Sequence, residues 1–408
     1  MERNVVSEAD PAKLEQWFEN LCLSDSQQSI NEAIEMFDKA RDVCPMPHSS
    51  RSGGYYLMLK DKDVRKAMLN WRTFASGPSA SRPLAADPAD QFRFPPLDFD
   101  GEEQSVWRHL FISTVNAKAA ERVKDRLRSD VVEILDSMAA KGKADLAVEL
   151  GDVIPARAIF YLLGIEDTAA QDQIFDANRD MLAEFEDPEK RNANIARMAA
   201  FALSEVEKRR ANPRDDALTQ LAHATKDGRP ITGEELAQIL TSMLAGGSGT
   251  TATAIADLFY EVLSRPQIKQ QLIDDPSLIP VAVEESLRLH TPFYGLFRRT
   301  TEEVELHDRR LPENSSVLMC WQSANLDPEA FDDPHAFRLD REPGRHLSFG
   351  LGRHACPGSP LARMELQLVL SEALSRYPNM ALASDDPVAP HFIGGNAVAI
   401  PSLPVIFT

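Results

Sequence analysis

Cysteine, aromatic residues and long apolar runs are scarce in this sequence. Its 408 residues include 4 cysteines and 7% aromatic residues. No two cysteines form a C-x-x-C pair, so a zinc ribbon has no support. No run reaches the roughly 18 apolar residues of a membrane-spanning helix, and the polar first residues are unlike a signal peptide. We therefore expect a cytoplasmic protein without a membrane span, in which three of the four cysteines are small buried side chains.

Positive charge is also scarce. The chain has 44 Lys and Arg against 63 Asp and Glu, a net charge of −19, which argues against nucleic acid and anionic membranes as partners. The basic residues are unevenly spread, however, and residues 105–128 carry six of them against two acids. The six are Arg108, Lys118, Arg122, Lys124, Arg126 and Arg128. This segment is either a solvated helix face or a docking surface for an acidic protein.

Helical periodicity covers most of the chain. Val123, Leu127, Val131 and Leu135 recur every four residues, which places them on one face of a helix. Mostly helix is also predicted over 10–41, 143–211 and 233–265, and short strands over 55–59, 303–306, 316–320 and 397–407. Strands and helices do not alternate regularly, so a doubly wound parallel sheet is not expected. With no linker or repeat in evidence, the sequence predicts one mainly α (α+β) domain over 1–408. Small sheets would lie at its edges, and residues 1–40 would form a helical lead-in.

One glycine-rich segment, FGLGRHACPG at 349–358, allows two interpretations. Its G-x-G-x-x-A pattern matches a dinucleotide-binding fingerprint, but such a fingerprint should follow a buried strand and open a helix. The residues before it, 345–349, make a poor strand, and Pro357 stands where that helix would already be under way. The dinucleotide interpretation is therefore weak.

The second interpretation is a loop that presents Cys356 as a metal ligand at the start of a helix. Pro357 is a favoured first helical residue, and the free amides and dipole of a helix N-terminus stabilise a thiolate. Gly350 and Gly352 permit positive φ angles and the close approach of a flat ligand, and Gly358 leaves room against the same ligand.

The pattern F-G-x-G-x-H-x-C-x-G, here Phe349 to Gly358, resembles the haem-ligand signature of the cytochromes P450. The resemblance covers about residues 40–408 and includes the segment CPMPHS at 44–49. It implies the cytochrome P450 fold, a haem b cofactor with Cys356 as the axial thiolate of the iron, and O2 as co-substrate. A thiolate ligand donates electron density to the iron and favours cleavage of the O–O bond.

Two further motifs carry the resemblance. Glu285-Ser286-Leu287-Arg288 is similar to the E-x-x-R of the family, whose two side chains are neighbours on a helix. The resemblance implies that Glu285 and Arg288 form a structural cluster with Arg341.

The second motif is AGGSGTT at 245–251. Its three glycines cost a helix about 1 kcal/mol each relative to alanine, so periodicity alone leaves open whether the helix ends here. By resemblance the helix passes over the haem, with Ala245 and Gly246 against it. The O2 site would then lie at Gly249, Thr250 and Thr251, with the Thr250 hydroxyl as hydrogen-bond donor.

The resemblance also assigns residues around the cofactor and the substrate. Desolvated haem carboxylates need cationic or donor partners, and these would be Arg108, Gln104, Arg298, His346 and His354. The implied pocket walls come from residues 80–99 and from Ser242, Ala245, Gly246, Phe293, Tyr294, Leu296, Phe297, Ala397 and Val398. Either Ser242 or Tyr294 could hold one polar group of the substrate.

Three positions depart from the family pattern. Gly249 replaces the acid that usually precedes the helix threonine, so the usual proton route lacks its carboxylate. Pro357 has no amide hydrogen to donate to the cysteine sulfur, which leaves more charge on that sulfur. Gln104 stands where the family often has histidine.

The resemblance implies a haem-thiolate monooxygenase that hydroxylates or O-demethylates a small apolar substrate, aromatic or terpenoid. Electrons would come from NAD(P)H through a reductase and an acidic ferredoxin docking near Arg108, Lys118, Arg122 and Arg126, and we expect a monomer. Because Gly249 stands in place of the usual acid, three alternative activities remain: a peroxygenase, a phenol-coupling enzyme or an isomerase. A non-catalytic haem sensor is the remaining alternative, although a sensor would not need the segment 246–251.

Overall fold

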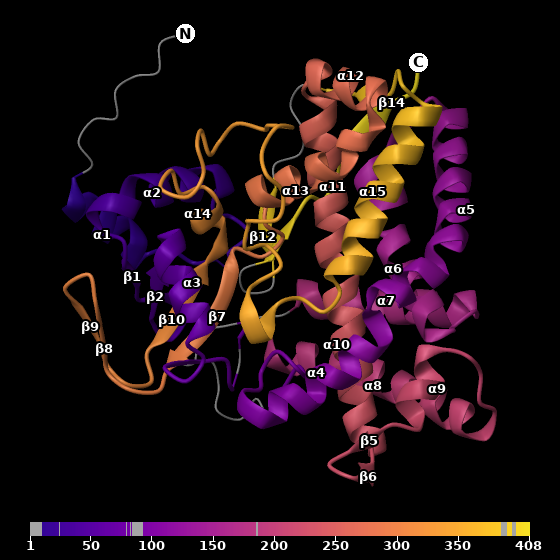
Figure 1. Cartoon of the computed structure of the whole chain (residues 1–408), viewed down its shortest axis with the longest axis horizontal. Helices are drawn as coiled ribbons and strands as arrows, with labels where there is room; N and C mark the ends of the chain where they lie inside the picture. Colours follow the sequence, from indigo (N-terminus) through magenta and orange to yellow (C-terminus); the bar gives the residue numbers. More distant parts are fainter. Residues whose placement is uncertain are drawn as a thin grey trace.

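The computed structural model divides into a helical part and a sheet-containing part (Figure 1). It describes residues 10–23, 25–78, 80–81, 83, 93–184, 187–384, 390–393 and 397–408. The helices are α1 Pro11–Glu19, α2 Ile30–Val43, α3 Asp61–Leu69, α4 Gly101–Val115, α5 Ala117–Lys141, α6 Val153–Leu163, α7 Thr168–Ala183, α8 Pro188–Ala211, α9 Ala217–Ala222, α10 Gly233–Gly247, α11 Gly249–Leu263, α12 Pro266–Asp274, α13 Ile279–Leu289, α14 Trp321–Asn325 and α15 Ser359–Arg376. The predicted mainly α fold with small sheets is confirmed.

The largest sheet has five strands in the order β1-β2-β10-β7-β3. Its strands are β1 His48–Ser49, β2 Tyr55–Met58, β3 Phe74–Ala75, β7 Gly295–Thr300 and β10 Ser316–Cys320. The remaining strands form small sheets: β4 Lys143–Asp145, β5 Thr225–Lys226, β6 Arg229–Pro230, β8 Val304–Leu306, β9 Arg309–Leu311, β11 Ala381–Leu382, β12 His391–Ile393, β13 Ala397–Ala399 and β14 Pro404–Ile406. The sequence did not predict β7, because its side chains are buried and show no alternation of polar and apolar residues.

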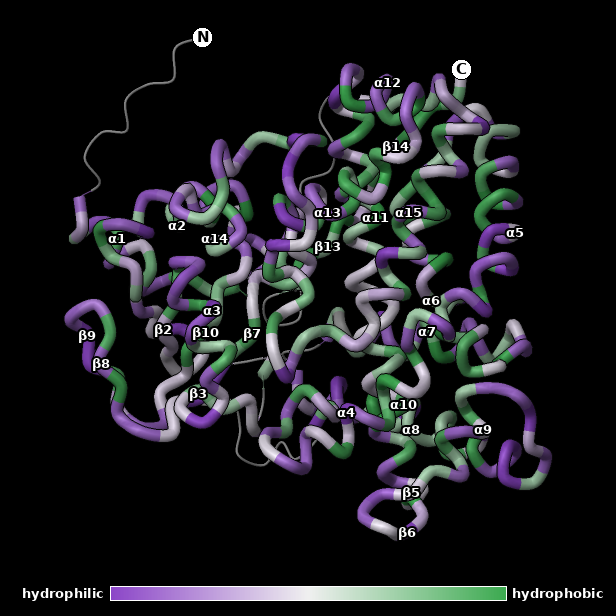
Figure 2. Tube along the Cα trace, viewed as in Figure 1, coloured by the Kyte–Doolittle hydropathy of each residue, from purple (hydrophilic) through white to green (hydrophobic). Residues whose placement is uncertain are grey.

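Helix α5 shows how an outer helix is built from its sequence. Asn116 caps its first turn by accepting from the amide of Ala119 at 3.0 Å, and Gly142 ends it at φ +73°. Its predicted apolar face is buried, including Leu127, Val131 and Leu135, and packs against α15. Hydrophilic and hydrophobic stretches alternate along this helix (Figure 2).

The segment 233–265, predicted to be mostly helix, forms two helices, α10 and α11. Thr232 and Glu235 form a capping box that starts α10. The chain leaves regular helical geometry at Ser248, where φ is −98° and ψ is −66°, and resumes as α11. The break falls within the glycine-rich segment, where helix propensity is lowest.

The carboxylate of Glu285 lies at the centre of a buried polar cluster. It accepts hydrogen bonds from Arg288 Nε and Nη2, each at 2.8 Å, and from Arg341 Nε at 3.0 Å. Arg288 also donates to the carbonyls of Asn325 and Ala336. One ion cluster therefore fixes α13 against the loop that precedes the cysteine segment.

No helix among the described residues combines the length and the apolar character that a membrane span would need.

We predict that Glu285→Ala lowers the free energy of unfolding by about 3–5 kcal/mol, because the buried Arg288 guanidinium and the half-buried Arg341 would lose their carboxylate. Urea denaturation followed by circular dichroism measures it. The control is Asp340→Ala, which removes an exposed partner of Arg338 and should leave the midpoint unchanged. Equal midpoints for the two variants would show that the cluster does not stabilise the fold.

Candidate active site

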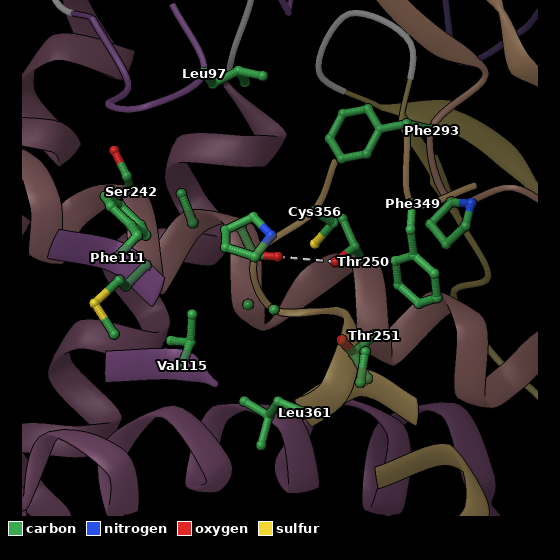
Figure 3. Close-up of a pocket in the computed structure, with 18 of the residues that line it drawn as sticks. Leu97, Phe111, Val115, Ser242, Thr250, Thr251, Phe293, Phe349, Cys356 and Leu361 are labelled. Carbon is green, nitrogen blue, oxygen red and sulfur yellow. Dashed lines mark hydrogen bonds between the residues drawn. The ribbon is translucent and has the colours of Figure 1, made fainter. Parts of the chain in front are cut away.

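A cavity of about 310 Å³ lies between the glycine-rich helix segment and the cysteine loop. Its walls come from α4, α6, α7, α10, α11, α13 and α15, from the start of β7, and from the loops at 93–97 and 348–358. Most of the lining side chains are apolar. Figure 3 draws the cavity, with Cys356 and Thr250 between Phe293 on one side and Ser242 and Phe111 on the other. Such a space suits a small apolar ligand with few polar anchors.

The loop 349–358 turns back on itself to present Cys356. The Cys356 amide donates to the carbonyl of Phe349 at 2.7 Å. Gly350 and Gly352 have φ angles of +68° and +66°, which other residues adopt only with strain. A β-carbon at Gly358 would stand 3.8 Å from the Cys356 sulfur. These glycines therefore let the backbone fold tightly around one sulfur, which opens on the cavity.

Opposing effects act on the Cys356 thiol. Burial raises its pKa, while the amides of Gly358 and Ser359 and the Arg108 guanidinium act to lower it. Arg108 itself lines the cavity and donates to the carbonyl of Ala355 at 2.6 Å. A metal ion bound at the sulfur would deprotonate it outright.

The opposite wall is the junction of α10 and α11. Ala245, Gly246, Thr250 and Thr251 line the cavity, and the Thr250 hydroxyl donates to the carbonyl of Gly246 at 3.0 Å. Gly249 begins α11 without lining the cavity. The structure thus places a hydroxyl, and no carboxylate, at the break in this wall.

The hydroxyl of Ser248 is held beside this break. It accepts from Asn178 Nδ2 at 2.7 Å and donates to the carbonyl of Leu244 at 3.1 Å. Both contacts are buried, so the Ser248 hydroxyl is engaged by the protein on both sides.

Two further predicted cationic groups differ in position: His354 lines the cavity, whereas Arg298 is buried without lining it. Arg298 is 4% exposed, burial lowers its pKa to about 10, and its Nη1 donates to the Phe297 carbonyl at 2.8 Å. Within the described part of the chain, no carboxylate forms a salt bridge with it. His354 lines the cavity with Nε2 3.1 Å from Asp100 Oδ1, and burial lowers its pKa.

The structure does not support two other predicted carboxylate partners. The His346 Nε2 atom lies 3.1 Å from Glu284 Oε2, and its Nδ1 accepts from the Ser348 amide at 3.2 Å, so neither ring nitrogen is free. Gln104 donates to the carbonyl of Arg353 at 2.8 Å, and neither His346 nor Gln104 lines the cavity. Both residues brace the cysteine loop from outside.

Four predicted pocket residues also lie elsewhere. Phe293 and Leu296 line the cavity, but Tyr294 and Phe297 do not. Tyr294 packs edge-on against Phe392, and Phe297 lies on the opposite face of β7 from Leu296 because side chains alternate along a strand. Ala397 and Val398 do not line the cavity; they pair with the backbone at Phe293 and Pro292.

Sequence reasoning missed several lining residues. Phe111 and Val115 come from α4 at helical spacing, and Trp321 begins α14 with a buried Nε1 that has no hydrogen-bond partner among the described residues. Glu365 of α15 was missed too. Of the predicted wall at 80–99, residues 82 and 84–92 lie outside the described residues, while Phe94, Pro95, Pro96 and Leu97 line the cavity. Only the tertiary fold brings these segments together.

The residues present fit an iron porphyrin. One sulfur at the cavity wall can ligate iron, the glycine-lined backbone leaves room for a flat ring, and the buried Arg298 needs an anion that a haem carboxylate would supply. The apolar walls suit the ring faces.

Comparisons with known proteins agree with this chemistry. A family model described as Cytochrome P450 matches residues 164–407. The chain is 31% identical to cytochrome P450 107B1 of Saccharopolyspora erythraea over 81% of this chain and 83% of that protein. It is 33% identical to mycinamicin IV hydroxylase/epoxidase of Micromonospora griseorubida over 80% and 83%. The structure of cytochrome P450 CYP109Q5 from Chondromyces apiculatus, 24% identical, superposes with a TM-score of 0.85 over 96% of this chain and 99% of that chain, which supports the fold. The chain therefore belongs to the cytochrome P450 family of monooxygenases.

Proposed function

We propose that this monooxygenase inserts one oxygen atom of O2 into a compact, largely apolar substrate, aromatic or terpenoid, by hydroxylation or oxidative O-demethylation. The observation that supports this proposal most directly is the apolar cavity, which has Cys356 on one wall and the Thr250 hydroxyl on the other. Because the haem would occupy much of this cavity of about 310 Å³, only part of the space is left for the substrate. Electrons would come from NAD(P)H through a reductase and a ferredoxin.

Haem would be held by Cys356, Arg108, Arg298 and His354, and when bound it supplies the activation of O2. The remaining tasks belong to the protein. Apolar side chains such as Phe111, Phe293 and Leu296 exclude water from the substrate. The Thr250 hydroxyl, which donates to Gly246, can turn that donor toward the cavity and hold a proton at its Oγ1.

Two kinds of measurement test the proposal. Ferric holoprotein is titrated with aryl methyl ethers, phenols and monoterpenoids, and a blue shift of the Soret band identifies ligands that displace the water on the iron. O2 uptake that requires NADH, reductase and ferredoxin, with an oxygenated product, would support the function. Because one relative is named a mycinamicin hydroxylase and others steroid C26-monooxygenases, a macrolide and a steroid complete the panel. Shifts with these alone would overturn the compact-substrate proposal.

A peroxygenase is the second candidate, and Gly249 favours it. Without a carboxylate at this position, delivery of protons is slower, and hydrogen peroxide already carries the protons and electrons that O2 needs. We predict that Gly249→Asp lowers H2O2-driven product formation and raises O2-driven product per NADH. The comparison is made at equal haem content. Undiminished peroxide turnover in the variant would contradict the prediction.

The proposed ferredoxin surface on α5 and α4 is uneven. Lys118, Arg122 and Arg126 are exposed, but the Arg126 guanidinium is engaged, 3.8 Å from the centre of the Tyr161 ring and 3.6 Å from Glu166 Oε1. Arg108 points inward to the cavity. Lys118 and Arg122 are four residues apart and share a face of α5. They are therefore the better placed of the four to meet an acidic protein.

We predict that Arg122→Glu weakens ferredoxin binding at low ionic strength and that the difference shrinks as salt is added, because screening removes the charge effect. Binding is measured by titrating ferredoxin at two salt concentrations. Arg179→Glu, on α7 and also exposed, is the matched control. Equal affinity of Arg122→Glu and wild type at low salt would refute this placement of the surface.

A further inference from the structure

The ionisable side chains of the cavity lie on or beside the wall that carries the cysteine. Among the described lining residues they are, besides Cys356 itself, Arg108, His354 and Glu365. His354 belongs to the cysteine loop, and Arg108 donates to the Ala355 carbonyl in that loop. Glu365 lies on α15, which begins directly after the loop. Since Arg108 and His354 are the groups that would hold haem carboxylates, neither is left for a charged group of the substrate.

Glu365 does not supply an anionic partner either. It is 1% exposed, and burial raises its pKa well above the usual value, since surroundings of low polarity disfavour the charged form. At neutral pH the group is therefore uncharged. The described walls thus offer no free cation to a carboxylate and no anion to an amine. Because burying an unpaired charge costs far more than burying a neutral group, these walls favour an uncharged substrate.

The other polar groups of the cavity are uncharged. Apart from Arg108, the described polar side chains that line the cavity outside the segment 348–366 are Ser81, Ser242, Thr250, Thr251 and Trp321. In two of them, Ser242 and Trp321, the Oγ or Nε1 atom is buried and has no hydrogen-bond partner among the described residues. A buried donor without a partner costs free energy. These two atoms are therefore the candidates for a hydrogen bond to a ligand.

The two candidates lie on different walls. Trp321 follows β10 and belongs with Leu347 to one cluster of buried side chains, directly before the cysteine loop and on the side that haem would fill. Ser242 belongs to α10 and lies beside Phe111, across the cavity from Phe293 (Figure 3). The substrate would lie between the haem and the wall formed by α10 and α11. Ser242 is therefore the better placed of the two to contact it.

The Ser242 hydroxyl can reach a ligand by rotation about one bond. The residue is part-buried and lines the cavity, although its Oγ atom is itself buried. Rotation about Cα–Cβ to another staggered rotamer breaks no hydrogen bond within the described part of the chain. The hydroxyl can then donate to a ligand or accept from it. The neighbouring Thr241 also has a buried hydroxyl without a partner among the described residues, but Thr241 does not line the cavity.

The position of Ser242 along the wall separates it from the proposed oxygen site. Ser242 precedes Thr250 by eight residues, which span ~12 Å of regular helix, and this helix is interrupted at Ser248. A group bound at Ser242 is therefore held well away from Thr250. The polar group and the oxidised carbon should lie at opposite ends of the substrate, with apolar side chains such as Phe111 and Val115 covering its body.

We propose that the substrate is an uncharged molecule with one oxygen-containing group, and that the Ser242 hydroxyl binds this group by a hydrogen bond. The group is a hydroxyl, carbonyl or ether oxygen, because a serine hydroxyl pairs with each of them. The inference rests on the proposed monooxygenase function and narrows its substrate class. Phenols, aryl ethers and oxygenated terpenoids remain, whereas carboxylic acids and amines are excluded.

Six compounds test the charge and the polar group of the substrate. Their dissociation constants are measured from the Soret shift of the ferric holoprotein at neutral pH, which requires no turnover. Two matched pairs, 4-propylphenol with propylbenzene and menthol with p-menthane, differ by one hydroxyl group. The anion 4-propylbenzoate and the cation 4-propylbenzylammonium keep the propylphenyl body and add one charge.

Three variants test the residue. S242A removes the proposed hydrogen-bonding group, and alanine favours the helix in which it stands. T241V is the matched control, because it removes the neighbouring unpaired hydroxyl that does not line the cavity. W321F removes the indole N–H of the other candidate and keeps an aromatic ring.

We expect 4-propylphenol and menthol to bind more tightly than their hydrocarbon partners, and the two ions to bind most weakly. S242A should weaken the binding of 4-propylphenol and menthol about 2- to 10-fold, the effect of one neutral hydrogen bond. Propylbenzene and p-menthane should bind S242A and wild type equally. T241V should change none of the constants, and W321F should not distinguish the members of a pair.

Three results would overturn the proposal. The first is a loss in S242A that is equal for both members of each pair, or no loss at all. The second is a loss confined to the hydroxyl compounds in W321F instead of S242A, which would assign the contact to Trp321. The third is tighter binding of either ion than of 4-propylphenol. If none of the six compounds binds to the wild type, the compact-substrate function itself fails, whereas binding that S242A leaves unchanged overturns the Ser242 contact alone.

Discussion

The structure depends on holding one cysteine sulfur at the wall of an apolar cavity. A free thiol is easy to bury. A sulfur that must face a flat ligand also needs a loop whose backbone leaves space for that ligand beside the sulfur. Gly350 and Gly352 adopt positive φ angles, and the Cys356 amide closes the loop onto Phe349. Helix α15 begins directly after the loop, so its first amides reach back toward the sulfur.

Polar groups around the cavity hold this loop in place. Gln104 bonds to Arg353, Arg108 to Ala355, and His346 to Glu284. The Glu285 cluster secures α13, the neighbour of α15, against the chain that leads into the loop. These polar contacts thus fix the geometry of one segment.

Few polar groups line the cavity, and they differ in whether they have a hydrogen-bond partner. The Thr250 hydroxyl donates to Gly246, whereas Trp321 Nε1 and Glu365 Oε2 have no hydrogen-bond partner among the described residues. In an apolar space such groups interact strongly with any charge or dipole that arrives. Polar recognition of a ligand therefore depends on a small number of atoms.

The sequence by itself determined the family, the mainly helical fold and the cysteine, because these follow from local patterns: the glycine-flanked loop, the E-x-x-R pair and the helical period. It also indicated Thr250 and the missing acid at Gly249. The tertiary structure alone decided which side chains face the cavity. Tyr294 and Phe297 turn away because β7, unrecognised in the sequence, alternates its faces. His346 is taken up by Glu284, and Glu365 and Trp321 reach the cavity from helices whose local sequence gives no sign of it. Local sequence pattern determines which residues lie on the same face of a helix or strand. Only the packing of distant segments determines which residues or cavity that face contacts.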